Sequence, residues 1–440
     1  MNLALAKTDS AAAASSVFLA ARERLPGSPG IAEARRQAFA AYERLGLPHR
    51  RVEEWKYTDL RTLMREVLPL AGAPDAAALE RARAALRSLA IEGPAKLVLL
   101  DGVFVPELSD LALLGGRITV RTLREAWESD GGDACADLLP TPSTDAMISL
   151  NAALATDGVV VGIADGTVLA DPIHIVHIAA APSASTFTRS YLKFGKGVRA
   201  SLLESFTAAE GAAGHQVNDA VIVSVGDDAE LSHVRLMADA ADAVNIASAI
   251  VTVGARAKLD LFNLTSGGAV SRFQGSITFR GEGSELSANG VNLLRGKQHG
   301  DTTLVVDHAV PQCVSRENFR AVVDDRGHSV FQGRIIVRPD AQKTDGKMMT
   351  RALLLSDEAE ADSKPELEIF ADDVTCGHGA TSGALDQSLL FYLRARGLPE
   401  KDAQALLIQA FLGEAIEQIA NEELRELVAA RAERWLEAWR

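Results

Sequence analysis

The sequence predicts a mainly β fold in which a parallel β-helix is flanked by helical regions at both ends. Two observations predict the core: short β-branched runs separated by turn residues, and a glycine motif that recurs at nearly constant spacing. Helix-forming residues dominate the ends. We therefore expect an N-terminal, mainly helical region (1–150), a β core (151–383) and a C-terminal helical domain (384–440).

Helix formers dominate the first region, and glycine and proline punctuate it. Three helices are expected there, at residues 31–45, 75–89 and 120–128. Residues 96–105 are strand-like around an Asp-Gly turn. Residues 51–60 (RVEEWKYTDL) place a tryptophan and a tyrosine among charges, which favours an aromatic anchor that holds a helical arm onto the body.

The motif Gly-x-x-(Ala or Ser)-x-Leu begins at Gly197, Gly226, Gly254 and Gly281, with spacings of 29, 28 and 27 residues. Such periods are typical of solenoids and propellers, whose units bury their apolar sides by stacking. The small residue at the fourth position suits a tight corner. No long helix separates the strands, so a parallel β-helix is favoured over alternating strands and helices. A propeller or a long β-sandwich stays open.

Three helices are predicted in the last region. The first covers residues 385–396, the second begins near Pro399, and Asn421 can cap the third. Trp435 and Trp439 near the end suggest either a docking surface or packing onto the β body.

Composition limits the function classes. A net charge of −14 argues against nucleic acid or an anionic membrane surface as the main partner. The three cysteines Cys135, Cys313 and Cys376 are too scattered for a disulfide framework, which fits a reducing compartment. No apolar run approaches the ~18 residues that a membrane span needs. We expect a cytoplasmic, soluble protein.

Residues 371–383 (ADDVTCGHGATSG) hold the strongest candidate site. In an extended segment Cys376 and His378 point to the same side, so they can present a thiol and an imidazole together. The surrounding glycines let another backbone or an inorganic ligand come close. The alternative is a glycine-rich turn whose cysteine packs as a small hydrophobe.

Other chemistries have weaker support. Residues 290–298 (GVNLLRGKQ) only superficially resemble a nucleotide-binding loop, because five residues separate the glycines and Gln298 replaces the magnesium-binding hydroxyl. Lone cysteines do not predict a stable zinc site. One cysteine and one histidine are an incomplete ligand set for an iron–sulfur cluster, so a partner chain would have to complete it. Adjacent aspartates at 324–325 and 372–373 point to opposite faces of a strand, which weakens a hydrolase hypothesis.

Five segments together resemble the SufD family, the scaffold subunits of the SUF iron–sulfur cluster assembly system. They are 53–60 (EEWKYTDL), 298–301 (QHGD) with His308 and Pro311, 341–344 (AQKT), 372–381 (DDVTCGHGAT) and 390–397 (LFYLRARG). They follow one another in the family's order over nearly the whole chain. The sister family SufB has additional cysteines and a His-Glu-Ala version of the C-terminal motif, so the resemblance is to SufD.

The resemblance implies a right-handed parallel β-helix and a scaffold that is not an enzyme. It implies pairing with SufB through the end of the β-helix and docking of the SufC ATPase on the C-terminal helices. The histidine matching His378 lies at the interface with SufB, where it is implicated in building the nascent cluster with a SufB cysteine; Cys376 lies beside it. Gly377 replaces the serine common in the motif. His308 and Cys313 match a neighbouring segment and are interface or structural candidates. Candidate residues for ATPase docking are Leu390, Phe391, Tyr392, Arg394, Arg396 and Phe411.

We therefore expect a scaffold without a nucleotide of its own, which shares a transient iron–sulfur cluster with SufB. SufC would hydrolyse ATP, and its closure would pull on the C-terminal helices and open the interface to expose Cys376 and His378. The residues leave flavin binding open. Two alternatives remain: a structural β-helix homodimer without a cluster role, which could also form when SufB is absent, and a carbohydrate-active β-helix enzyme.

Overall fold

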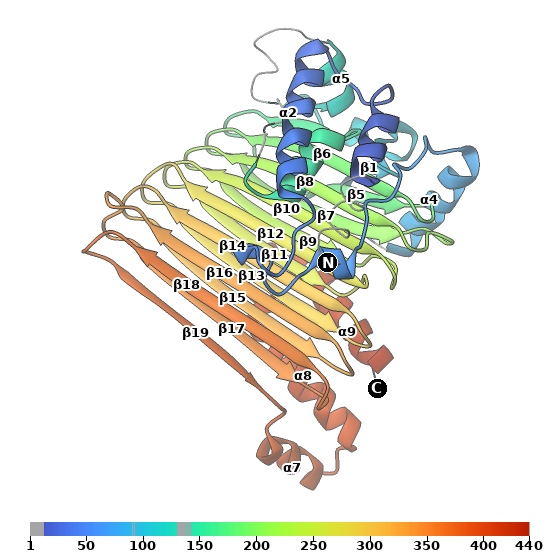
Figure 1. The fold of residues 1–440 in the computed structure, drawn as a ribbon. Coiled ribbons are helices and arrows are strands. Elements are labelled where there is room, and N and C mark those ends of the chain that lie inside the picture. The colour runs from blue at the N-terminus through green and yellow to red at the C-terminus, as the bar shows by residue number, and fades with distance from the viewer. Residues whose placement is uncertain are drawn as a thin grey trace.

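The computed structural model describes residues 13–89, 91, 93–129, 138, 141 and 143–439 (Figure 1). Its core is a parallel β-solenoid built from a ten-stranded and a nine-stranded sheet. From β4 onward, successive strands alternate between the two sheets, so each turn of the coil adds one strand to each sheet. This confirms the predicted parallel β-helix over a propeller or a β-sandwich.

The strands of each sheet are given in spatial order. The ten-stranded sheet contains β19 (Thr375–Gly383), β17 (Asp345–Leu354), β15 (Val314–Val323), β13 (Glu285–Leu294), β11 (Lys258–Thr265), β9 (Glu230–Met237), β7 (Arg199–Ala208), β5 (Ile173–Ala179), β1 (Ala95–Leu100) and β2 (Val103–Phe104). The nine-stranded sheet contains β18 (Glu360–Ile369), β16 (His328–Val337), β14 (His299–His308), β12 (Val270–Phe279), β10 (Val244–Val253), β8 (Gln216–Val225), β6 (Ser185–Phe194), β4 (Val159–Ile163) and β3 (Ile118–Thr122). Among these strands only the pairs β1–β2 and β3–β4 are antiparallel.

Helices cover the outer faces of the sheets (Figure 1). The N-terminal helices include α6, which contacts β6 and β8 of the nine-stranded sheet, and α2, which packs on α6; α8 and α9 lie against the ten-stranded sheet. Among the described residues, no helix is long and apolar enough to cross a membrane. Residues 13–21 are helical. The helices that follow are α2 (Pro29–Leu45), α3 (Leu60–Leu63), α4 (Ala76–Leu89), α5 (Leu123–Ser129), α6 (Ala146–Leu154), α7 (Gln387–Ala395), α8 (Glu400–Ile416) and α9 (Glu422–Trp439), with short 3-10 turns at η1 (Glu53–Trp55), η2 (Pro106–Leu108) and η3 (Leu111–Leu113).

The predicted repeat marks one corner of the solenoid, but its first copy is displaced. Strand register aligns Gly226, Gly254 and Gly281 in successive turns, as the motif predicts. The pairing of Arg199 with Glu230 places Gly195, and not Gly197, in the same position. The prediction for the first copy was therefore wrong by two residues.

The physical reason lies in two different uses of glycine at this corner. Gly197 takes φ +64, and its counterpart Asp228 takes φ +57, so this position demands the left-handed region. The position of Gly226 demands space instead, since a Cβ there would lie 2.7 Å from the carbonyl carbon of Gly195. The motif did not distinguish a glycine that is needed for its positive φ from a glycine that is needed for space, so its first copy was placed at the wrong glycine.

The N-terminal region contributes strands as well as helices. The Asp101-Gly102 turn joins β1 to β2 as predicted, with φ +49 and +76. The expected helix at 120–128 is only partly correct, since residues up to Thr122 pair with β4 as strand β3. Thr122 and Glu125 then exchange backbone-to-side-chain hydrogen bonds of 3.0 Å each, a capping box that starts α5. Both β1 and β3 precede residue 150, yet they extend the two sheets of the core.

Candidate functional site

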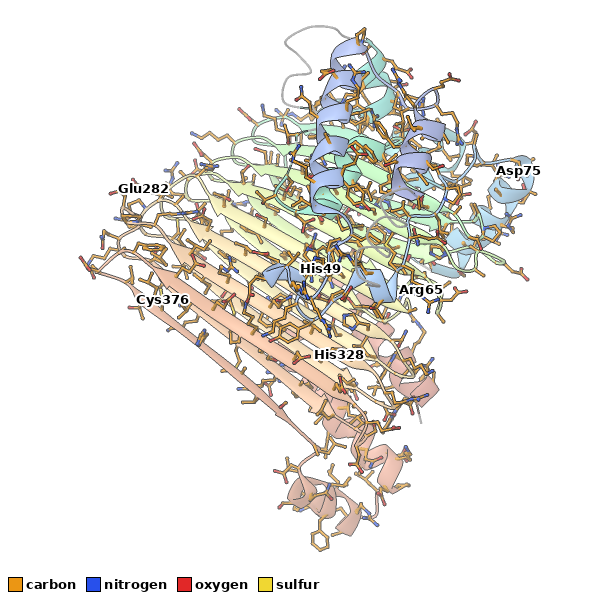
Figure 2. All side chains as sticks on the ribbon, in the orientation of Figure 1. His49, Arg65, Asp75, Glu282, His328 and Cys376 are labelled. Atoms are coloured by element: carbon orange, nitrogen blue, oxygen red, sulfur yellow. The ribbon has the colours of Figure 1, made fainter. Side chains whose placement is uncertain are left out.

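Cys376 and His378 lie on β19, the last strand of the solenoid, which pairs with β17 along one side only. Figure 2 shows Cys376 near the start of this outermost strand, at the end of the solenoid away from the N-terminal helices. The two residues are two apart in a continuous strand, so they share a face, as expected from the sequence. Cys376 is half-buried against the interior core and His378 is exposed.

The end of the solenoid that carries this pair is open. Strands β18 and β19 are largely exposed or half-buried, whereas the strands before them are mostly buried. Within the described part of the chain each has a strand neighbour on one side only, so part of its backbone donors and acceptors is left for another chain. Pro365 in β18 fits an edge position, because proline cannot donate to a ladder. This end can therefore be continued by a partner.

Polar groups lie beneath the edge strand, inside the coil. Register places Cys376 over Gly346 and Gly346 over Ser315, while His378 lies over Met348 and Glu317. Glu317 is buried, and neither carboxylate oxygen has a hydrogen-bond partner among the described residues. Burial raises the pKa of Glu317 to about 8.

The surroundings of Cys376 do not favour a thiolate. Burial raises the pKa of its thiol above the ordinary value, and the nearby acidic groups Asp345 and Glu317 add to the shift. The neutral thiol is therefore the resting form at neutral pH. A cation brought to the site, such as iron, would have to displace the proton.

His308 and Cys313 lie in the interior, which favours their structural interpretation. His308 Nε2 lies 3.0 Å from Ser315 Oγ, and its ring packs 4.7 Å from that of Phe279. Burial lowers the pKa of His308 to about 4. Cys313 occupies the small-residue position of the corner, in register with Ser284, and is fully buried.

The six candidate docking residues separate into two groups. Phe391 and Tyr392 on α7 are 73% and 53% exposed. Leu390 is buried, and Phe411 is partly buried under the guanidinium of Arg320. Arg396 lies 4.5 Å over the ring of Tyr392, and Arg394 lies 3.4 Å from Glu400, so both shape the surface of α7.

Leu389 is also 52% exposed and was missed by the sequence analysis. The sequence did contain a signal for it, namely an apolar residue within the predicted helix at 385–396. Leu389 and Phe411 line a groove of about 320 Å³ between α7, α8 and the ends of β17 and β19. An apolar partner side chain fits such a groove.

The two C-terminal tryptophans pack onto the body. Trp435 is buried, and Trp439 donates a hydrogen bond of 2.7 Å from Nε1 to Asp324. Of the two alternatives for these residues, packing is confirmed. Asp325 accepts a hydrogen bond of 2.9 Å from the backbone N–H of Gly296, so both members of this aspartate pair stabilise a corner.

The predicted aromatic anchor at residues 51–60 is confirmed. Trp55 is buried, with the guanidinium of Arg272 3.9 Å from its ring, and it donates a 2.8 Å hydrogen bond to Asp145. Thr58 Oγ1 lies 2.9 Å from His299 Nε2 on β14. The arm is thus fixed to the nine-stranded sheet. Residues 285–294 form β13, so the superficial nucleotide-loop match begins in a strand.

Comparison with known proteins identifies the family. Residues 177–411 match the family model "SUF system FeS cluster assembly, SufBD core domain", and residues 19–175 match "SufBD protein N-terminal region". The chain belongs to the SufBD family. The resemblance inferred from the sequence motifs is thereby confirmed.

Relatives in the SufBD family include SufD proteins. The iron-sulfur cluster assembly protein SufD of Escherichia coli is 32% identical over 393 residues, which cover 88% of this chain and 89% of that protein. A SufBD family protein of Synechocystis sp. is 31% identical over 411 residues, with 88% of each chain covered. SufD of Bacillus subtilis is 30% identical over 184 residues, 38% of this chain and 41% of that protein.

Proposed function

We propose that this chain is a non-enzymatic scaffold for de novo iron–sulfur cluster assembly, which pairs with SufB and docks the SufC ATPase. The observation that carries the proposal is the position of Cys376 and His378 together on the edge strand β19, at an open solenoid end. Membership of the SufBD family supports it.

The chemistry of the edge pair fits a shared, transient cluster. A thiol sulfur and an imidazole nitrogen are iron ligands, but two ligands from one chain do not complete a cluster. A partner that continues the sheet beside β19 would bring its own ligands to the same place. Iron binding would release the Cys376 proton, so assembly at this site would consume a thiol and yield a bound thiolate.

Helix α7 offers a surface for SufC. Its exposed apolar side chains Leu389, Phe391 and Tyr392 lie close together in sequence on a helix with few buried residues. Exposed apolar clusters of this kind are typical of protein-binding surfaces. Three residues connect the end of β19 at Gly383 to the start of α7 at Gln387. Movement of α7 during ATP hydrolysis by SufC would therefore act directly on the strand that carries Cys376.

The proposal is tested in cells that depend on this SUF system. We expect His378→Ala and Cys376→Ala to reduce cluster delivery to a reporter iron–sulfur enzyme by about tenfold or more. The matched control is Thr375→Ala, an exposed position on the same strand. Wild-type cluster delivery by His378→Ala would show that the site assignment is wrong. In that case an open end that pairs only with a second copy of this chain becomes the better reading.

A further inference from the structure

A second group of ligand-type side chains lies inside the coil, near the opposite end from Cys376. His177 comes from β5, Glu204 from β7 and Asp219 from β8, so both sheets contribute. All three side chains are buried, with 6%, 0% and 1% exposure. They lie among apolar interior residues such as Ile175, Leu202 and Val221, beside the buried side chains of His233 and Arg235.

The three residues converge on one point. One ligand atom from each lies within 4.8 Å of the others. His177 Nε2 is 3.9 Å from Glu204 Oε1 and 3.9 Å from Asp219 Oδ1, distances too long for hydrogen bonds. Among the described residues, neither His177 Nε2 nor Glu204 Oε1 has a hydrogen-bond partner. Two buried polar atoms therefore face one another unsatisfied, across a gap that an ion bound at about 2.0–2.2 Å from each would bridge.

Neighbouring groups fix the orientation of these ligands. The other oxygen of Glu204 is hydrogen-bonded to His233 Nε2 at 2.6 Å and also pairs with Arg235. Asp219 Oδ1 accepts a 2.7 Å hydrogen bond from Thr188. The His177 ring stacks on Phe206 at 4.3 Å. Such outer-shell contacts are what orient ligands in metal sites.

Charge also favours a cation. Two carboxylates, those of Glu204 and Asp219, face a single guanidinium, that of Arg235.

We propose that His177, Glu204 and Asp219 form an internal binding site for one divalent transition-metal ion. Imidazole with carboxylate oxygen and no sulfur is a donor set for Zn²⁺, Fe²⁺ or Mn²⁺. The ion ties the two sheets together across the interior. It is separate from the cluster site at β19, because no residue is shared between them.

The test uses the full chain with Cys376→Ser and His378→Ala, so that the edge pair contributes no ligands. The protein is stripped with a chelator, then exposed to Zn²⁺ or, without oxygen, to Fe²⁺. Bound metal is measured by plasma mass spectrometry and stability by thermal unfolding. We expect about one ion per chain and a higher Tm with metal.

The matched pair of variants is His177→Gln and His215→Gln in the same background. His215 is also buried beside a carboxylate, Asp239, but lies outside the group. We expect His177→Gln to lose both the ion and the Tm shift, and His215→Gln to keep them. The proposed site is wrong if the parent protein binds no stoichiometric ion, or if both variants retain the ion equally. A proton would then balance the charge of the buried carboxylates.

A spectroscopic measurement keeps the proposal testable if His177→Gln fails to fold. X-ray absorption on the loaded parent chain should show nitrogen and oxygen neighbours at about 2.0–2.2 Å and no sulfur shell. A sulfur shell would contradict the assignment. Neither SufB nor SufC takes part in these experiments, so their outcome is independent of the proposed function.

Discussion

At the residue scale, the edge site combines an exposed imidazole with an interior that resists charge. Glu317 lies two strands below His378 in register, without a hydrogen-bond partner in the described part of the chain. A buried carboxyl group of this kind stays protonated because its ionised form has lost its hydration. Cys376, whose pKa is raised by burial and by nearby acidic groups, is held neutral by the same environment.

Glu317 predicts a pH dependence of stability. Its pKa of about 8 in the folded chain exceeds the ordinary value of 4.5, so both states hold the proton below pH 4.5. As pH rises from 4.5 towards 8, the unfolded chain loses its proton first, and stability falls by about 1.4 kcal/mol per pH unit. Above the folded pKa the decline ends.

We expect Glu317→Gln to flatten this decline, as measured by urea unfolding at a series of pH values. Glu360→Gln on the exposed start of β18 serves as the control and should keep the wild-type slope. Parallel pH profiles for wild type and Glu317→Gln would mean that Glu317 is ionised in the folded chain.

At the element scale, the corner glycines decide how closely one turn of the coil stacks on the next. Gly226 lies against Gly195, and Gly281 lies against the backbone of Ala255. Gly377 is different, because no atom lies within 4 Å of where its Cβ would be. The glycines of the repeat are thus needed for stacking, whereas Gly377 is not sterically required.

We predict that Gly226→Ala destabilises the chain by about 2 kcal/mol or more, because the added carbon overlaps the backbone of the previous turn. Gly377→Ala should change stability by no more than about 0.5 kcal/mol. Urea unfolding of both variants provides the comparison. Equal stabilities would show that the corner relaxes freely around an added side chain.

At the scale of the whole molecule, different helices cover the two outer faces of the solenoid. The N-terminal arm and α6 cover the nine-stranded sheet, and α8 and α9 cover the other. Removing all residues after Gly383 would uncover Leu203, Val234 and Phe262, which pack under these helices. Point substitutions on α7 therefore test partner docking more cleanly than truncation.

We expect the double variant Phe391→Ser with Tyr392→Ser to fold normally and to lose SufC. Both side chains are more than half exposed, so the core is unaffected, while truncation of central interface aromatics weakens binding by about tenfold or more. Co-purification with SufB and SufC, followed by size-exclusion chromatography with light scattering, measures the result. Val168→Ser, 67% exposed elsewhere on the solenoid, is the control. Undiminished SufC binding would contradict docking on α7.

The sequence by itself determined the repeating β architecture, the terminal helices, the aromatic anchor and the pairing of Cys376 with His378 on one face. These features follow from local periodicity, turn residues and spacing within single segments. Such patterns can be read from the sequence without knowledge of the tertiary structure. It also predicted the family, through motifs that lie within short stretches.

Only the tertiary structure decided the true register of the first corner, the interior position of His308 and Glu317, and the meeting of His177, Glu204 and Asp219. Contacts across the coil depend on how many residues form the corners of each turn. A shift of one residue in a strand moves all of its side chains to the opposite face of the sheet. Because corner length varies from turn to turn, local patterns cannot fix which interior residues face each other. That arrangement is set by the stacking of the turns.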